Sequence, residues 1–156
     1  MTTITHTVTI DRPVEDVWDY LMDIRNDPLW SPNIVGVGRG AGEPVEVGLE
    51  FEETYRFLGV RIPLTFTVTE LRPHCRSAVR IIDGPIPGGG SYDLEPFDGG
   101  TRFTATVHTD AHGFFKLTEP VFVRMARRDM AASAEHLKDI LEANGTRRND
   151  SRTDGP

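Results

Sequence analysis

A glutamate within an apolar row of residues has the clearest chemical potential in this chain. Glu53 shares an alternating phase with Leu49, Phe51, Tyr55 and Phe57. Successive side chains of a strand point to opposite faces, so this phase predicts a buried face that contains a carboxyl group. Burial disfavours the charged carboxylate and raises its pKa, which suits general acid–base catalysis. We therefore predict Glu53 and Tyr55 as catalytic candidates; the alternative is a bulge or sheet edge that turns Glu53 to solvent.

Further aromatic residues predict the lining of a cavity beside Glu53. Tyr55 and Tyr92 each place a hydroxyl where it could donate to a ligand carbonyl, although packing at the rim of the core stays open. Trp30 lies in a proline-containing turn and is interpreted as a cap on the cavity, with plain core packing as the alternative. The other predicted ligand-binding residues come from the sheet and a later helix: Phe51, Phe66, Phe103, Phe122, Ala126 and Met130.

Two other patterns contain residue types that bind metals or phosphate. His108, Asp110 and His112 alternate, so they share one face of an extended segment and could bind zinc. The apolar residues before them occupy the opposite phase, which favours an ordinary polar surface, and we predict no metal site. The glycine triplet at 88–90 matches neither a P-loop nor a dinucleotide fingerprint, because no helix follows it. We therefore predict no cofactor.

The elements that position these residues follow from hydrophobic periodicity. Apolar and polar residues alternate over 2–10, which predicts a strand. Apolar residues recur at helical spacing over 14–21, which predicts a short helix, and the proline-containing segment 27–33 predicts a turn or a second small helix. Residues 34–110 alternate with period two between glycine and proline breaks, which predicts about six more strands. Residues 118–144 predict one long amphipathic helix. So few crossover helices exclude a parallel sheet, and the predicted class is α+β.

Composition limits the classes of partner. The formal charge of -7 argues against nucleic-acid binding, which needs a basic surface. No apolar run reaches the ~20 residues of a membrane span, so no membrane insertion is predicted. The N-terminus lacks the pattern of a signal peptide and the single Cys75 cannot form an internal disulfide, so we predict a cytoplasmic protein. A homodimer stays open.

The chain length of 156 residues predicts one domain with one core. Residues 144–156 contain no aliphatic or aromatic residue, and such a composition is typical of a disordered tail. We therefore predict a single ligand-binding domain over residues 1–143 and a tail over 144–156.

Four segments carry a family resemblance. They are VTIDRPVEDVWDYLMDIRNDPLWSPNI at 8–34, TVTELRP at 67–73, GGGSYDLEPFDGGTRFT at 88–104 and HLKDILEA at 136–143. Together they resemble the START/Bet v1-like superfamily (SRPBCC), in particular its polyketide cyclase/dehydrase branch. The resemblance implies a helix-grip fold: a curved antiparallel sheet of about seven strands wraps around a long C-terminal helix, with one or two short helices after the first strand. It also implies a deep cavity between the sheet and that helix.

Three functions remain open at this level. The first is binding of a small hydrophobic ligand, such as a lipid or polyketide, which the resemblance implies. The second is a polyketide cyclase, aromatase or dehydratase that uses Glu53 as acid or base. The third is a protein-interaction module without a ligand, for which Arg124, Arg127 and Arg128 supply a basic helix face. The quoted motifs mark packing and turns, so they identify the fold and leave the activity undecided.

Overall fold

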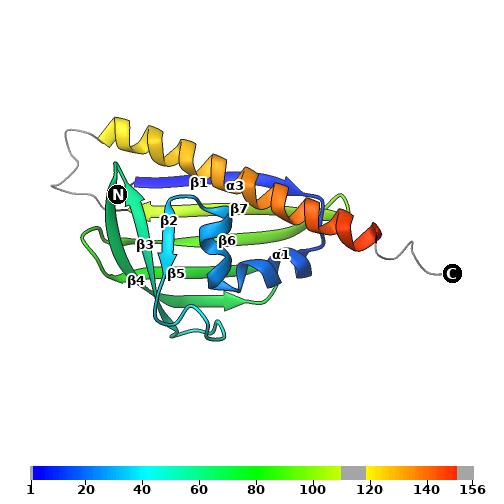
Figure 1. Cartoon of the computed structure of the whole chain (residues 1–156), viewed down its shortest axis with the longest axis horizontal. Helices are drawn as coiled ribbons and strands as arrows, with labels where there is room; N and C mark the ends of the chain where they lie inside the picture. The colour runs from blue at the N-terminus through cyan, green and yellow to red at the C-terminus, as the bar shows by residue number, and fades with distance from the viewer. Residues whose placement is uncertain (1, 110–118, 151–156) are drawn as a thin grey trace.

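The computed structural model describes residues 2–109 and 119–150 (Figure 1). The elements in chain order are β1 (Thr2–Ile10), α1 (Val14–Leu21), η1 (Ile24–Asn26), α2 (Asp27–Trp30), β2 (Ile34–Val37), β3 (Glu50–Phe57), β4 (Val60–Arg72), β5 (Arg76–Asp83), β6 (Gly88–Phe97), β7 (Gly100–Thr109) and α3 (Glu119–Asp150). Among these residues no helix is long and apolar enough to cross a membrane.

The strands form one antiparallel sheet of seven strands in the order β1-β7-β6-β5-β4-β3-β2. The helices lie on one face of this sheet, and α3 runs along its length beside β1 (Figure 1). The pairing of β4 with β5 shifts register between Thr65 and Phe66 and again between Val68 and Glu70. Such bulges bend a strand and increase its twist, which curves the sheet. The predicted α+β helix-grip fold with about seven strands is confirmed.

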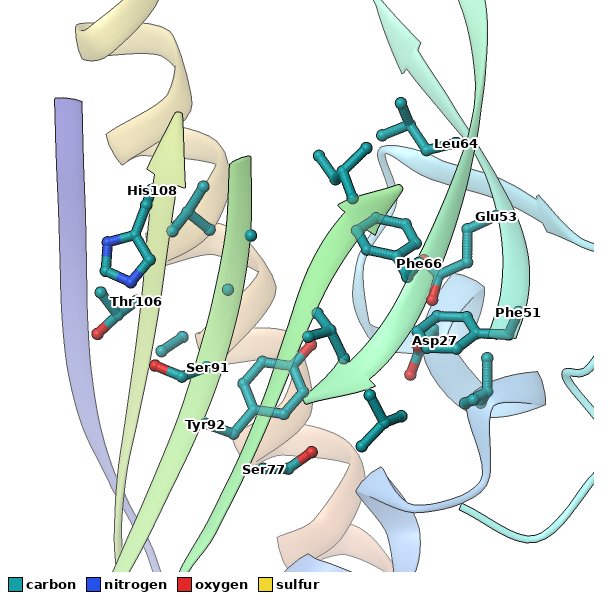
Figure 2. Close-up of a pocket in the computed structure, with 18 of the residues that line it drawn as sticks. Asp27, Phe51, Glu53, Leu64, Phe66, Ser77, Ser91, Tyr92, Thr106 and His108 are labelled. Atoms are coloured by element: carbon teal, nitrogen blue, oxygen red, sulfur yellow. The ribbon is translucent and has the colours of Figure 1, made fainter. Parts of the chain in front are cut away.

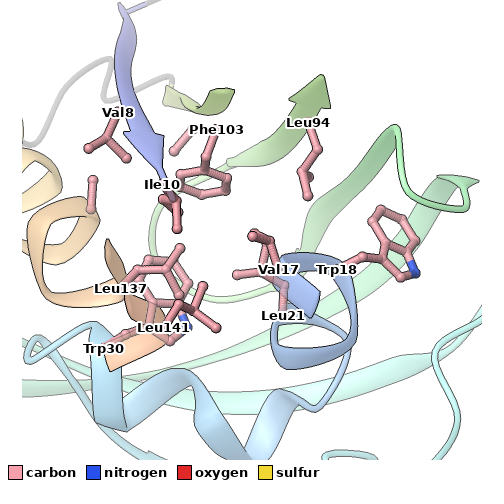
Figure 3. Packing of buried hydrophobic residues seen from close by; sticks show 12 residues of the cluster. Val8, Ile10, Val17, Trp18, Leu21, Trp30, Leu94, Phe103, Leu137 and Leu141 are labelled. Atoms are coloured by element: carbon pink, nitrogen blue, oxygen red, sulfur yellow. The ribbon is translucent and has the colours of Figure 1, made fainter. Parts of the chain in front are cut away.

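The main core joins α1, α2 and α3 to the β1, β6 and β7 end of the sheet. Phe103 of β7 is fully buried there and Val17 of α1 and Leu137 of α3 pack in the same cluster (Figure 3). A second hydrophobic cluster is formed by residues of η1, β3 and β4 and includes Phe51 and Phe66. The two clusters fix the short helices between α3 and the far half of the sheet.

Polar contacts hold the C-terminal half of α3 against the start of the chain. Lys138 Nζ donates to the carbonyl of Thr9 at 2.7 Å, and Arg12 Nη1 donates to the carbonyl of Leu141 at 2.6 Å. The backbone N–H of Asp11 donates to a Glu142 carboxylate oxygen at 3.0 Å. These bonds satisfy backbone groups at the end of β1 and fix the angle at which α3 crosses the sheet.

Leu137 tests how far the fold depends on this helix. It is fully buried, so Leu137→Ala removes apolar contacts and leaves a cavity, and we expect the free energy of unfolding to fall by about 2 to 5 kcal/mol. Urea denaturation followed by circular dichroism measures the change. The neighbouring His136 is exposed, and His136→Ala is the control with an expected change below about 0.5 kcal/mol. Equal effects of the two substitutions would contradict the burial of this helix face.

The predicted helix end at Asn144 is wrong, because α3 continues to Asp150. A Cβ atom at Gly145 would lie 2.9 Å from Arg12 Cδ, so this glycine allows close packing in the helix instead of ending it. Adding one residue to an existing helix costs little compared with starting one, so polar residues can extend it. Residues 151–156 lie outside the described part, and the domain boundary at residue 143 stays a prediction.

Candidate functional site

A cavity of about 270 Å³ lies between the concave face of the sheet and the segment from α1 to α2 (Figure 2). Its wall is mostly apolar. The described lining residues are Leu21, Met22, Ile24, Asp27, Val45, Phe51, Glu53, Tyr55, Leu64, Phe66, Val68, Ser77, Val79, Ile81, Ile86, Gly89, Gly90, Ser91, Tyr92, Ala105, Thr106, Val107, His108 and Thr109. None of these residues is a lysine or an arginine. His108 is the basic side chain of this lining, and its Nδ1 lies 3.5 Å from the hydroxyl of Thr3 on β1.

Glu53 is the most deeply buried acidic side chain of this wall. It pairs with Leu64 across β3 and β4, and the register of these two strands runs without a shift from Glu50 to Phe57. The predicted phase of Glu53 is therefore correct, and the bulge that would have turned it to solvent is absent from this pairing. Only 4% of its surface is exposed, and its Oε2 atom has no hydrogen-bond partner within the described residues.

Asp27 supplies a second buried carboxyl group, next to Glu53 on the cavity wall. It is the first residue of α2 and is 7% exposed. The indole N–H of Trp30 donates to Asp27 Oδ1 at 3.3 Å, one helical turn further along. Trp30 therefore holds the aspartate in place from the core side, where its ring packs edge-on against Tyr92 and Phe103.

The two carboxyl groups titrate as a pair. Burial raises the pKa of Glu53 well above its ordinary 4.5, and the charge of Asp27 raises it further. Burial raises the pKa of Asp27 to about 6, although hydrogen bonds from Glu53 and Trp30 act in the opposite direction. Two adjacent buried carboxylates cannot both ionise at low cost. The pair therefore loses its two protons in separate steps, and Asp27, whose pKa is raised less, ionises first.

The two predicted tyrosines frame this pair. Burial raises the pKa of both Tyr55 and Tyr92 well above 10, and the charges of Glu53 and Asp27 act in the same direction. Both hydroxyls therefore stay protonated and available as donors. Each ring keeps some accessible surface, although it lies deep in the molecule, because that surface faces the cavity. Phe66 stacks on Phe51 with ring centroids 5.2 Å apart, so ring faces and edges form much of the wall.

Five of the predicted site residues thus lie on the wall, namely Phe51, Glu53, Tyr55, Phe66 and Tyr92. Trp30 and Phe103 do not: they are 4% and 0% exposed and belong to the main core behind it. Trp30 therefore acts through Asp27 and does not cap the cavity. Alternation along a strand shows that Phe103 faces inward, but it does not show whether an inward side chain lines a cavity or fills the core.

The prediction that Ala126 and Met130 of the C-terminal helix line the cavity is also wrong. Ala126 and Met130 are absent from the described lining, and Met130 packs against the main core. The side chain of Phe122 lies outside the described part. In its described part, α3 contacts β1 most, so the short helices and not α3 close the described cavity over β3 to β5.

Gly89 and Gly90 of the glycine triplet form a section of wall without side chains. A Cβ atom at Gly89 would lie 2.4 Å from the carbonyl oxygen of Val79, and one at Gly88 would lie 2.2 Å from that of His108. Both distances are too short for any other residue. Neighbouring strands therefore approach so closely here that the cavity meets bare backbone. The triplet is the first part of strand β6.

The remaining candidates lie apart from the two carboxyl groups. His108 Nδ1 is 3.5 Å from the hydroxyl of Thr3, on the side of β7 that pairs with β1, while Asp110 and His112 lie outside the described residues. Arg124, Arg127 and Arg128 are exposed on α3. Asp27 was missed by sequence reasoning. Its signal is an acidic residue three positions before a buried tryptophan, a spacing that lets the indole donate within one helical turn.

A curved sheet with helices on one face and an interior cavity defines the class of helix-grip proteins. The chain belongs to the family Polyketide cyclase / dehydrase and lipid transport, whose model matches residues 1–142. The predicted resemblance to the START/Bet v1-like superfamily and its polyketide cyclase/dehydrase branch is confirmed. A comparison with curated proteins found no match.

Solved structures share the fold at low sequence identity. A protein from Thermus thermophilus is 14% identical, covers 92% of this chain and 99% of its own, and has a TM-score of 0.78. A START superfamily protein from Mycobacterium smegmatis is 14% identical, with coverage of 90% and 97% and a TM-score of 0.74. The Zhui aromatase/cyclase from Streptomyces is 22% identical, with coverage of 90% and 93% and a TM-score of 0.69.

Proposed function

We propose that the protein binds one small hydrophobic molecule in the cavity between its sheet and the short helices. The observation that carries this proposal is an unfilled space of about 270 Å³ with a mainly apolar wall. Protein interiors are close-packed, and voids much larger than a water molecule are few. Concave apolar spaces with a few converging polar groups are typical of ligand sites. The family includes lipid-transport proteins, which supports the same function.

Native mass spectrometry of the purified protein tests ligand binding directly. We expect an added mass that is released on denaturation and belongs to an apolar compound. Val79 lines the cavity, and Val79→Phe places a ring in the open space, so we expect occupancy to fall at least tenfold. Arg80 follows it on β5 and is exposed, and Arg80→Phe is the matched control with unchanged occupancy. Equal occupancy in both variants would contradict binding in this cavity.

We propose, as a second candidate, that the same cavity catalyses proton transfer at a carbon next to a carbonyl group. The observation that favours it is the pair of buried carboxyl groups on the cavity wall. Asp27, with a pKa of about 6, suits the role of the base, while the more strongly raised pKa of Glu53 suits the role of the acid. Tyr55 can orient the carbonyl oxygen. Aldol-type cyclisation begins with this step, and a structural relative is an aromatase/cyclase.

A further inference from the structure

The polar groups of the cavity are unbalanced in charge. Two adjacent carboxyl groups line it, and no lysine or arginine is found in its described lining. Glu53 is 4% exposed and its Oε2 atom has no hydrogen-bond partner within the described residues. Buried acceptors without a donor are costly, so an unpaired carboxyl oxygen at a cavity wall marks the place where a ligand donor fits.

The rings around the carboxyl pair favour the same kind of ligand group. Tyr55 lies 6.2 Å from Phe66 between ring centroids, and Phe66 stacks on Phe51. The faces of aromatic rings carry partial negative charge and attract cations. Acceptors and ring faces therefore dominate this end of the site.

We propose that the natural ligand is an apolar molecule with a protonated amine, and that the ammonium group binds between Asp27 and Glu53. This inference rests on the proposed ligand-binding function and deepens it. An ammonium offers three donors, enough for the unpaired Glu53 oxygen, for Asp27 and for one tyrosine hydroxyl. Its charge compensates the negative charge of the pair. The apolar remainder of the molecule contacts Leu64, Val79 and Ile81.

The same arrangement disfavours acidic ligands. A carboxylate headgroup, as in a fatty acid, would bring a third acid next to two buried ones, and no lysine or arginine of the described wall would compensate it. Such like-charge contact is unfavourable at low local dielectric. An uncharged alcohol of the same size lies between these cases, since it donates one hydrogen bond without compensating charge. We therefore expect binding affinity to decrease from the amine to the alcohol and from the alcohol to the carboxylate.

Three fluorescent probes that share a naphthylethyl body and differ in the headgroup test this order: naphthylethylamine, naphthylethanol and naphthylpropanoate. At pH 7.5 we expect the amine to bind about tenfold tighter than the alcohol or better, because a hydrogen bond to a charged group is worth about one power of ten or more in affinity. The propanoate should bind more weakly than the alcohol. Fluorescence titration or calorimetry of the full chain gives the three dissociation constants.

Variants assign the preference to the carboxyl pair. In Glu53→Gln and in Asp27→Asn we expect amine affinity to fall about tenfold while alcohol affinity changes less than about twofold. Retained alcohol binding shows that each variant is folded. Glu52 is the next residue on β3, lies in the opposite phase and is partly exposed, so Glu52→Gln is the matched control with no change for any probe.

The outcomes separate this inference from the proposed function. Equal binding of amine and alcohol, or an amine preference that both variants retain, overturns the amine inference and leaves ligand binding intact. Failure of all three probes to bind, together with no co-purifying mass, overturns both. Loss of the amine preference in the two variants but not in Glu52→Gln supports the inference.

Discussion

Replacing Asp27 by Asn is expected to slow proton exchange in a bound ketone by about 10²- to 10⁴-fold under the catalytic proposal, because the base that accepts the proton is removed. A suitable probe is acetonaphthone, whose methyl hydrogens exchange slowly in heavy water without a catalyst. The base takes a C–H proton, Glu53 holds the developing enolate oxygen, and a deuteron returns to carbon. Proton NMR of the methyl signal measures the rate.

The control for this experiment compares both carboxyl groups. Glu53→Gln should also slow exchange, and the double variant should be no slower than the slower single variant, because groups that act as a unit are not additive. Glu52→Gln should exchange at the wild-type rate. If the unmodified protein does not accelerate exchange, or if both variants keep full activity, the catalytic proposal is contradicted and binding alone remains.

The second large effect is an unusual dependence of stability on pH. The pKa of Asp27 is raised from 3.8 to about 6 in the folded protein, and that of Glu53 is raised well above 4.5. Between the unfolded and folded pKa values the folded state binds more protons than the unfolded state, so the stabilisation is complete below pH 4 and is lost as pH rises. For Asp27 the whole effect corresponds to about 3 kcal/mol.

We expect the free energy of unfolding to fall by at least about 1 kcal/mol between pH 5.0 and 7.5, with Glu53 adding to the effect of Asp27. Urea denaturation at several pH values measures it. The range stays above pH 5 because Asp23, Glu70 and Glu142 have lowered pKa values and contribute in the opposite direction in more acidic solution. The double variant Asp27→Asn, Glu53→Gln should flatten the profile, whereas an unchanged profile would refute the titration of this pair.

The sheet and its inward-facing glutamate were predictable from the sequence because strands have a strict two-residue period. In β3 the alternation places Glu53 beside Phe51 and Tyr55, and no register shift with β4 disturbs it. Asp27 was not predictable in the same way, since it lies in a short proline-containing helix without a period. Its burial depends on Trp30 and on strands far along the chain.

The assignment of wall and core could not follow from local pattern. The apolar stripe of α3 correctly indicates one buried face, but the stripe does not say what covers that face. In the structure Met130 packs on the main core, while α1, η1 and α2 cover the described cavity. Phe103 and Phe66 have the same alternation, yet one fills the core and the other lines the open space.

The bare backbone at Gly89 is a part of the cavity wall that substitution cannot reshape. A Cβ atom there would lie 2.4 Å from the carbonyl oxygen of Val79, so no larger residue fits without moving the neighbouring strand. Changes in the size or shape of the accepted molecule are therefore expected at lining positions that carry apolar side chains, such as Leu64, Val79 and Ile81. A redesign for a different ligand can begin with substitutions at these three residues and keep Asp27 and Glu53 unchanged.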